Sequence, residues 1–184
     1  MYRVSYGAHT YGTIEPIGGR RRDRVVVGKY CSIGKDVKAF LPGDHNFNLI
    51  STFPFFHPRK VITKYITTPR LPETQHYDAP SRGNITIGND VWIGHGAVIF
   101  RGTTIGDGVC IGAFSIITKN IQPYSMVVGH TRILRKRFSQ EDIDFLLNLK
   151  WWDFDDEVVG EIAPILHTPD VNLLRQWAKE KGKI

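Results

Sequence analysis

The residue best suited to chemistry is His45, which lies in the irregular stretch GDHNFNLISTFPFF at 43–56. An imidazole titrates near neutral pH, so a histidine can act as a general base, bind a metal ion or serve only as a structural loop residue. The apolar and aromatic residues that follow His45 do not distinguish these three roles. Which role it has depends on the elements that position it.

The sequence on both sides of this stretch repeats with a period of six residues. A helix is excluded, because apolar residues six apart would drift around its axis. The period fits short strands joined by turns, with glycine taking the tight backbone after each inward-facing residue. Stacked coils bury together what one coil cannot bury alone, so a mainly β fold is expected, a parallel β-helix of hexapeptide repeats. The ladder is Ile87, Ile93, Ile99, Ile105, Ile111 and Ile117, preceded in the same frame by Val27 and Ile33.

Two segments break the period. An insertion at 39–84 is rich in proline and aromatic residues, and we expect it to fold as a loop that leans over the coil. Pro123 stands where the next isoleucine would fall and ends the repeat. Beyond it the apolar spacing becomes helical. The expected domains are a β-helix at 1–138, which contains the insertion, and a helical cap at 139–184 over the open end of the coil, where strand edges would otherwise be exposed.

Other reactive side chains have weaker support in the sequence. Cys31 falls at an inward-facing repeat position and Cys110 has no neighbouring base, so neither is expected to be a thiol nucleophile. A β-helical zinc enzyme of the carbonic anhydrase type would need histidines repeated at the spacing of the coil. His95 has no histidine five or six residues away, and we expect no metal site.

The formal net charge is +6, and the positive charge gathers in RRRDR at 20–24 and RILRKR at 132–137. Neither cluster has the interleaved aromatic residues of a single-strand nucleic-acid platform, and both suit a polyanionic small molecule. We therefore expect no nucleic-acid partner. The chain has no apolar run long enough to span a membrane, no secretion signal and no disulfide framework, so a cytoplasmic location is expected.

Several motifs add to the repeat, and with them the chain resembles the hexapeptide-repeat xenobiotic acetyltransferases, the group of virginiamycin (streptogramin) and type B chloramphenicol acetyltransferases. The resemblance runs from about residue 26 to the C-terminal helices. The spacing from His45 to STFPF and the WW-D element are specific to this group, whereas the ladder is shared with a wider set of acetyltransferases. The motifs are YCSIG (30–34), STFPF (51–55), GNDVWIG (88–94), IGDGVCIGAFSIITKNI (105–121), RKRF (135–138) and WWDF (151–154).

The resemblance implies a left-handed β-helix, a homotrimer with active sites between subunits, and transfer of acetyl from acetyl-CoA to a hydroxyl. It places the catalytic histidine of the family at His45. The chemistry agrees, because a base of near-neutral pKa that removes the hydroxyl proton accelerates attack on a thioester by about 10²–10⁴-fold. No acyl-enzyme is needed when the thioester and the acceptor are bound side by side.

The resemblance also implies where the substrates bind. The arm of CoA is expected along small residues at coil turns, and its phosphates beside basic side chains, since a guanidinium binds phosphate through paired donors. The expected cofactor-binding residues are Gly94, Gly112, Ala113, Thr118, Lys119, Arg132, Arg135 and Lys136. The acceptor is expected against Tyr11, Phe53 and Phe55.

Two departures from the family bear on the acceptor. Drug-acetylating members carry a longer tyrosine-rich segment before YCSIG, where this chain has only Tyr2, Tyr6 and Tyr11, and the sequence VGHT at 128–131 replaces the usual proline-containing turn. We therefore expect the acceptor to be a sugar or polysaccharide precursor. The alternatives are a xenobiotic acetyltransferase that acetylates a streptogramin or chloramphenicol and so confers antibiotic resistance, and a repeat scaffold that only binds a partner.

Overall fold

The computed structural model describes residues 3–19, 23–41, 45, 48–53, 55–56, 64–68 and 83–184, and in this part of the chain short strands are followed by helices. The strands are β1 (Arg3–Tyr6), β2 (Ile14–Ile17), β3 (Arg24–Val27), β4 (Ser32–Ile33), β5 (Val37–Phe40), β6 (Ile85–Ile87), β7 (Trp92–Ile93), β8 (Val98–Phe100), β9 (Thr104–Ile105), β10 (Cys110–Ile111), β11 (Ile116–Ile117), β12 (Ser125–Val128) and β13 (Arg132–Lys136). The helices are α1 (Gln140–Leu149), the short 3-10 helix η3 (Trp151–Asp153), α2 (Asp156–Leu166) and α3 (Val171–Glu180).

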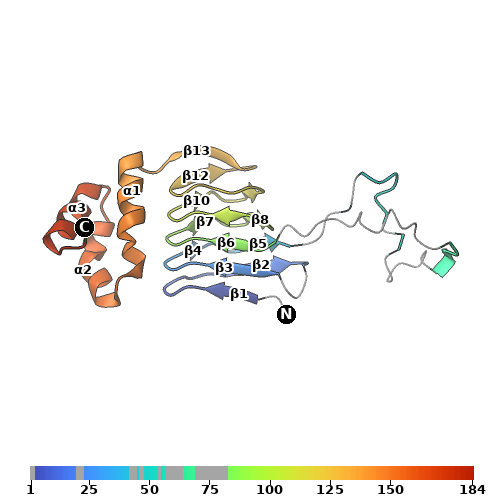
Figure 1. Ribbon diagram of the computed structural model, residues 1–184, viewed down its shortest axis with the longest axis horizontal. Coiled ribbons are helices and arrows are strands. Elements are labelled where there is room, and N and C mark those ends of the chain that lie inside the picture. Colours follow the sequence, from blue (N-terminus) through green and yellow to red (C-terminus); the bar gives the residue numbers. More distant parts are fainter. Residues whose placement is uncertain are drawn as a thin grey trace.

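The strands form three sheets, which run along a stack of coils from β1 at the bottom of Figure 1 to β13 at the top. Sheet A has the order β1-β3-β6-β9, sheet B the order β13-β12-β10-β7-β4, and sheet C the order β11-β8-β5-β2. The paired strands are parallel, apart from β12 and β13, which pair antiparallel. Each of the three central coils, β3-β4-β5, β6-β7-β8 and β9-β10-β11, contributes one strand to each sheet.

The isoleucine ladder fills the inside of this stack. Ile87 pairs with Ile105 in sheet A, as Ile93 pairs with Ile111 in sheet B and Ile99 with Ile117 in sheet C. Partners are eighteen residues apart, so three hexapeptides make one coil and successive isoleucines visit the three sheets in turn. Each of the six is at most 2% exposed. The arrangement is consistent with the predicted β-helix.

The corner between sheets A and B, called the AB corner below, requires a left-handed backbone in every coil. Residues at this position stack through backbone hydrogen bonds, as from the Asp90 N–H to the Lys29 carbonyl at 2.9 Å. Only one of them is glycine, although a positive φ is costly for residues with a Cβ. The AB corner therefore presents a column of side chains to its outside. Its residues are His9, Tyr30, Asp90, Gly108 and Tyr124, with φ from +52° to +67°.

The insertion leaves the coil at the opposite side, between β5 of sheet C and β6 of sheet A. Ala39 and Leu41 are buried in the core, so the interruption begins after Leu41 and not at 39 as the sequence suggested. The described residues of the insertion lie away from the coil in Figure 1, which differs from the expected loop that leans over it. Their aromatic side chains are exposed because the coil of the same chain does not cover them.

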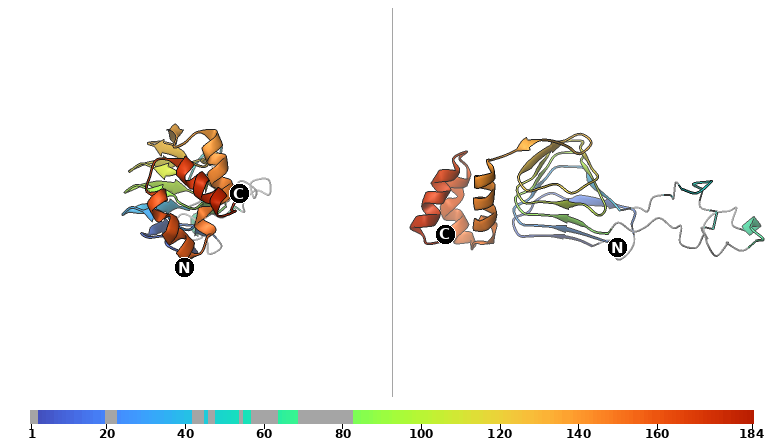
Figure 2. Two further views of the ribbon diagram at one scale, coloured as in Figure 1. Left: turned by 90° about the vertical axis from the view of Figure 1, so that its left-hand side faces the viewer. Right: turned by 45° about the horizontal axis from the view of Figure 1, so that its top comes forward.

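The helices lie beside the stack, facing the AB corner, and do not cover its open end as the sequence suggested (Figures 1 and 2). The rings of Tyr30 and Trp151 are 4.9 Å apart, and Lys29 Nζ lies 3.0 Å from Asp153 Oδ1. The aromatic side chains of the corner column thus supply the apolar surface that the helices need. At the top of the stack the edge of β12 is covered by β13.

The helices and the corner share a second core, separate from the ladder. Its buried members are Tyr124, Ile143, Phe145, Leu146, Leu149, Trp151, Trp152, Ile162, Leu174, Trp177 and Ala178. Tyr124 is therefore a side chain of the coil that is buried in the core formed with the helices. None of the described helices has both the length and the apolar character that a membrane crossing requires.

Candidate active site

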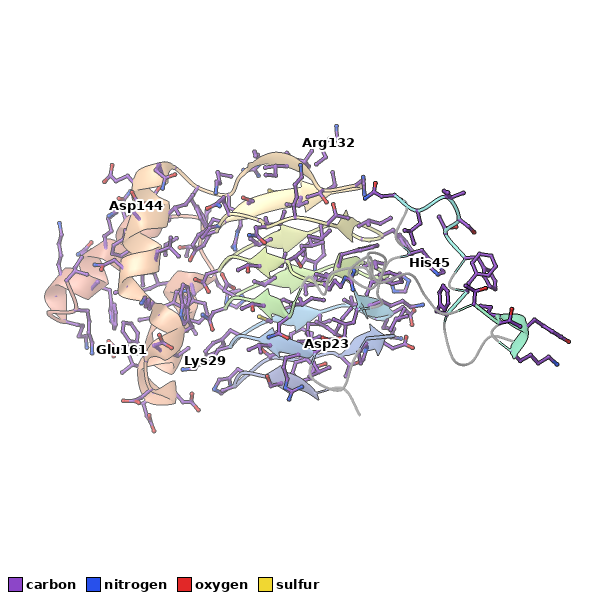
Figure 3. All side chains as sticks on the ribbon, turned by 45° about the vertical axis from the view of Figure 1, so that its right-hand side comes forward. Asp23, Lys29, His45, Arg132, Asp144 and Glu161 are labelled. Carbon is purple, nitrogen blue, oxygen red and sulfur yellow. The ribbon has the colours of Figure 1, made fainter. Side chains whose placement is uncertain are left out.

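His45 lies on the insertion, on the side of the coil away from α1 and α2 (Figure 3). Its Nδ1 is 2.6 Å from the carbonyl oxygen of Thr52. A carbonyl can only accept a hydrogen bond, so in the neutral imidazole Nδ1 carries the proton and Nε2 has the free lone pair. The side chain is exposed, and Nε2 is the nitrogen that can take a proton from a substrate.

Phe53 directly follows Thr52 and forms a pair with Phe55, two residues further along the chain. Their ring centroids are 4.9 Å apart and the planes meet at 63°, an edge-to-face contact. The two rings are 43% and 42% exposed. The insertion thus brings two of the three predicted acceptor residues close to His45 in the chain, with open apolar faces.

Tyr11, the third predicted acceptor residue, lies on the coil instead. Its backbone pairs with Ser32 in sheet B, and its side chain is 66% exposed. It stands at one end of an outward-facing column of sheet B whose other end is Arg135 on β13. Five steps of about 4.8 Å separate the ends, roughly 24 Å, so Tyr11 and Arg135 cannot hold the same small group. The column is Tyr11, Ser32, Trp92, Cys110, Met126 and Arg135.

The predicted cofactor glycines are explained by the stacking of the coils alone. A Cβ added to Gly94 would lie 2.5 Å from the backbone nitrogen of Ala113 in the next coil. One added to Gly112 would lie 2.9 Å from Val128 Cγ1. Close approach between coils therefore requires glycine at Gly94, where a Cβ would meet backbone, and favours it at Gly112, where a Cβ would meet a side-chain methyl group.

Thr118 is held by the turn that departs from the family pattern. The Thr118 N–H donates to Thr131 Oγ1 at 3.1 Å, and the Thr131 hydroxyl donates to the Ile116 carbonyl at 2.8 Å. Thr131 is buried and has a φ of +54°. The turn at 128–131 thus closes the last coil by a side-chain bridge. The next residue, Lys119, is exposed.

The basic residues of β13, together with Arg137 directly after it, divide into two groups. Arg132 and Arg135 are exposed and can reach a ligand. Lys136 Nζ instead donates to the Pro123 carbonyl at 2.7 Å, which ties β13 to the last AB turn. Arg137 donates from Nη1 to the Gly108 carbonyl at 2.8 Å, and the same nitrogen lies 3.4 Å from Asp90 Oδ2.

The pair of Asp90 and Arg137 was not foreseen from the sequence. Asp90 belongs to GNDVWIG and Arg137 to RKRF, two of the motifs that carried the resemblance. Burial raises the pKa of the Asp90 carboxyl above its usual value, and the Arg137 guanidinium opposes that rise. The sequence offered one signal for this pair, namely that two of the family motifs carry opposite charges. Their role is to fasten β13 and the helices to the AB corner.

Other reactive groups do not gather around His45 in the described residues. His95 lies at the corner between sheets B and C, against the Phe114 ring, with Nδ1 3.8 Å from Asp36 Oδ2. Burial raises the pKa of the Cys31 and Cys110 thiols, which disfavours the thiolate that a nucleophile needs. No cluster of three or more metal-binding side chains occurs among the residues that the structure describes.

Comparison with known proteins identifies the class first. The family model described as bacterial transferase hexapeptide (six repeats) matches residues 84–119, which span the isoleucine ladder. A solved hexapeptide-repeat acetyltransferase from Vibrio cholerae superposes with a TM-score of 0.50 at 22% identity, over 74% of this chain and 64% of that one. The chain thus spans less than two thirds of that structure, and the likeness concerns the fold. The same Vibrio protein is also known as a complex with acetyl coenzyme A, matched with a TM-score of 0.50 at 21% identity over 72% of this chain and 60% of that one.

Curated relatives match over most of the chain. A chloramphenicol acetyltransferase of Agrobacterium fabrum is 37% identical over 162 residues, which are 86% of this chain and 74% of the relative. The virginiamycin A acetyltransferase of Staphylococcus aureus is 37% identical over 158 residues, 85% of this chain and 69% of the relative. The chain therefore belongs to the family of bacterial hexapeptide-repeat acetyltransferases that includes these enzymes, and it is an acyltransferase.

Proposed function

We propose that this acyltransferase moves the acetyl group of acetyl-CoA to a hydroxyl group of a small acceptor, with His45 as the general base. The observation that carries the proposal is the 2.6 Å contact between His45 Nδ1 and the Thr52 carbonyl, which leaves Nε2 free to accept a proton. Support for the donor comes from the Vibrio relative that was solved with acetyl coenzyme A.

In the proposed reaction the acceptor oxygen attacks the carbonyl carbon of the thioester while His45 Nε2 takes the hydroxyl proton. The Thr52 carbonyl, already bonded to Nδ1–H, stabilises the positive charge that forms on the imidazole. The C–S bond then breaks, and the imidazolium returns its proton to the CoA thiolate. The products are the acetyl ester and CoA, and the free base is restored without an acyl-enzyme. A backbone N–H of a coil turn is the proposed donor to the oxyanion.

We further propose that the coil is left-handed and that the chain forms a homotrimer with its active sites between subunits. The outside of the coil and β13 carry large exposed apolar side chains that such an assembly would cover. His45 and the Phe53–Phe55 pair also need a second surface to enclose a substrate. The exposed apolar residues of the coil and β13 are Trp92, Phe114, Ile116, Ile133 and Leu134.

For the cofactor we propose that the CoA phosphates bind near Arg132 and Arg135, which are exposed on β13. Lys136 lies beside them, although its ammonium already donates to the Pro123 carbonyl. The arm of CoA would follow the coil turns. The residues proposed for that path are Gly94, Gly112, Ala113, Thr118 and Lys119.

Two acceptor classes have support. The relatives that cover most of the chain are named for chloramphenicol, macrolide and virginiamycin, which favours a hydroxylated antibiotic. A galactoside O-acetyltransferase of Escherichia coli is 53% identical over 116 residues, 58% of this chain and 57% of that relative, which favours the sugar predicted from the sequence.

The free thiols of Cys31 and Cys110 favour a reducing compartment, and we propose a cytoplasmic location.

The proposal is tested by following CoA release from acetyl-CoA against a panel of antibiotics and sugars. His45→Ala is expected to lower kcat by about 10²–10⁴-fold while the Kd for CoA stays unchanged, because the base acts only on the acceptor. His95→Ala, which removes an exposed histidine of the coil, is the matched control and is expected to keep its turnover. Full activity of the His45 variant would refute the assignment, and efficient turnover of an antibiotic would exclude the sugar as the main acceptor.

A further inference from the structure

The corner between sheets B and C, called the BC corner below, is cut short by the last coil. In the coil beneath it, four residues join Ile111 at the end of β10 to Ile116 at the start of β11. Their partners in the last coil, Val127 and His130, are joined by only two residues. Among the described coils, the turn at 113–114 therefore has no turn stacked above it.

The shortened corner leaves a backbone acceptor open. Lower in the stack the Lys35 carbonyl accepts from the Gly96 N–H at 2.9 Å, and the His95 carbonyl accepts from the Phe114 N–H at 2.8 Å. The next carbonyl in this column belongs to Ala113. The residue that would donate to it is omitted by the last coil, so within the described chain this carbonyl is available to a donor of a ligand.

Phe114 stands at this open turn with a left-handed backbone, φ +55°, and its side chain is 70% exposed. Such a φ is unfavourable for a residue with a Cβ. The tyrosines of the AB corner share this backbone but pack against the helices, since Tyr124 is 1% exposed and the ring of Tyr30 lies 4.9 Å from that of Trp151. Phe114 has no comparable cover among the described residues. Strained residues of this kind cluster at ligand sites.

The coil beneath holds the ring of Phe114 in place. A Cβ added to Gly96 would lie 2.6 Å from ring carbons Cδ1 and Cε1, so the ring packs directly on the Gly96 backbone. The His95 ring supports it edge to face, with 5.1 Å between the ring centroids. The ring is thus an apolar surface in a fixed place, next to the open carbonyl of Ala113.

Exposed positive charge lies above this turn. Val128 lies over Gly112, with Cγ1 2.9 Å from the place of a Cβ on Gly112, and Arg132 pairs with Val128 from β13. Two strand spacings of about 4.8 Å put Arg132 roughly 10 Å above Gly112, which is two residues before Phe114. One ligand can therefore hold an anionic group at Arg132 and lay an apolar chain with amide donors along 113–114.

We propose that Phe114 is a cofactor-binding residue that makes the site select CoA over nucleotides without its pantetheine arm. The arm carries two amides and a pair of methyl groups. An amide N–H would donate to the Ala113 carbonyl, and the methyl groups would lie on the Phe114 ring. Nucleotides offer the same phosphates to the arginines but no arm, so the contact with Phe114 discriminates between them. The inference rests on the proposed binding of the CoA phosphates near Arg132 and Arg135.

The test compares CoA with 3′-phospho-ADP, which keeps the nucleotide part of the cofactor and has no arm, by calorimetry on the full chain. Phe114→Gly is expected to raise the Kd for CoA about tenfold, because apolar contact area is lost, and to leave the Kd for 3′-phospho-ADP unchanged. The variant is expected to fold, since glycine adopts this φ without strain. Phe114→Leu keeps an apolar side chain and should lose less affinity.

Lys150→Gly is the matched control. Lys150 is also exposed and left-handed, with a φ of +47°, but it ends α1 and lies outside the proposed path of CoA, so this variant should bind both ligands as the wild type does. An unchanged Kd for CoA in Phe114→Gly, or an equal rise for both ligands, would overturn the proposal. So would a loss of subunit association in light scattering with CoA affinity intact, because a neighbouring subunit would then cover the ring.

A double variant separates this inference from the proposed phosphate site. Arg132→Ser with Arg135→Ser should raise the Kd for both ligands, whereas Phe114→Gly should raise only that for CoA. If the arginine variant binds both ligands normally while Phe114→Gly still weakens CoA alone, the placement of the phosphates is wrong and the contact with the arm stands. Failure of the wild-type protein to bind CoA would refute both.

Discussion

Replacing Arg137 by methionine is expected to destabilise the protein through the AB corner, without touching His45. The substitution keeps an unbranched side chain and removes the guanidinium. Two contacts are lost, the 2.8 Å bond to the Gly108 carbonyl and the 3.4 Å contact with Asp90. A hydrogen bond from a charged donor contributes about 1.5–3 kcal/mol. The side chains are 28% and 31% exposed, so the ion pair adds at most about 1 kcal/mol.

The expected loss for Arg137→Met is therefore about 2–4 kcal/mol, measured by urea unfolding at a fixed protein concentration. Asp90→Asn alone is expected to cost much less than Arg137→Met, because burial of the carboxylate offsets its attraction to Arg137, and the double variant should show a coupling of at most about 1 kcal/mol. Arg135→Met is the matched control, since Arg135 is an exposed arginine two residues before Arg137, and it should cost less than about 0.5 kcal/mol. Equal losses for Arg137→Met and Arg135→Met would refute the role assigned to Arg137.

Three further predictions concern charge, cofactor and backbone. Burial raises the folded-state pKa of Asp90, so the folded protein keeps the proton of this carboxyl to higher pH than the unfolded chain does. The free energy of unfolding should therefore fall as pH rises above the ordinary Asp value near 3.8. Asp90→Asn should flatten this pH dependence, measured by urea unfolding from about pH 3.5 to 7. Changing Arg132 and Arg135 together to serine should raise the Kd for CoA at least tenfold and that for 3′-dephospho-CoA less, by calorimetry, and an equal effect on both would contradict contact with the 3′-phosphate. Gly94→Ala should lower the free energy of unfolding by more than about 2 kcal/mol, because its Cβ meets backbone. Gly160→Ala in α2, with open space around it, should instead add about 1 kcal/mol to the free energy of unfolding and so raise the melting temperature.

The coil could be predicted from the sequence because the pattern that specifies it lies within a few consecutive residues. A single inward residue recurs every six positions, and the pairing of Ile87 with Ile105 follows once three such strands close one turn. The position of the helices could not be predicted in this way. It depends on the outward side chains of Tyr30, Asp90 and Tyr124, which come together only when the coils are stacked.

The candidate site was only partly accessible from the sequence. His45, Phe53 and Phe55 are close in the chain, and the insertion keeps them together. Coil stacking requires glycine at Gly94 and favours it at Gly112, so the repeat explains both residues and their type carries no independent information about CoA. In the proposed trimer the insertion would meet the coil of a neighbouring subunit, and the local sequence pattern carries no information about such a contact.

The contacts along the AB corner join the C-terminal segment to both ends of the stack of coils. The C-terminal part of the chain reaches the first coil through the 2.8 Å pair of His9 and Asp156, and the last through the packing of Phe138 on Tyr124. In a simple solenoid each repeat senses only its neighbours, and coils can be added or lost with additive effects. Here the C-terminal segment contacts both the first and the last coil, so its length has to match the height of the stack. Inserting one coil would displace one of these two contacts by about 4.8 Å, so a coil could not be added without losing a contact, and unfolding should be cooperative from end to end.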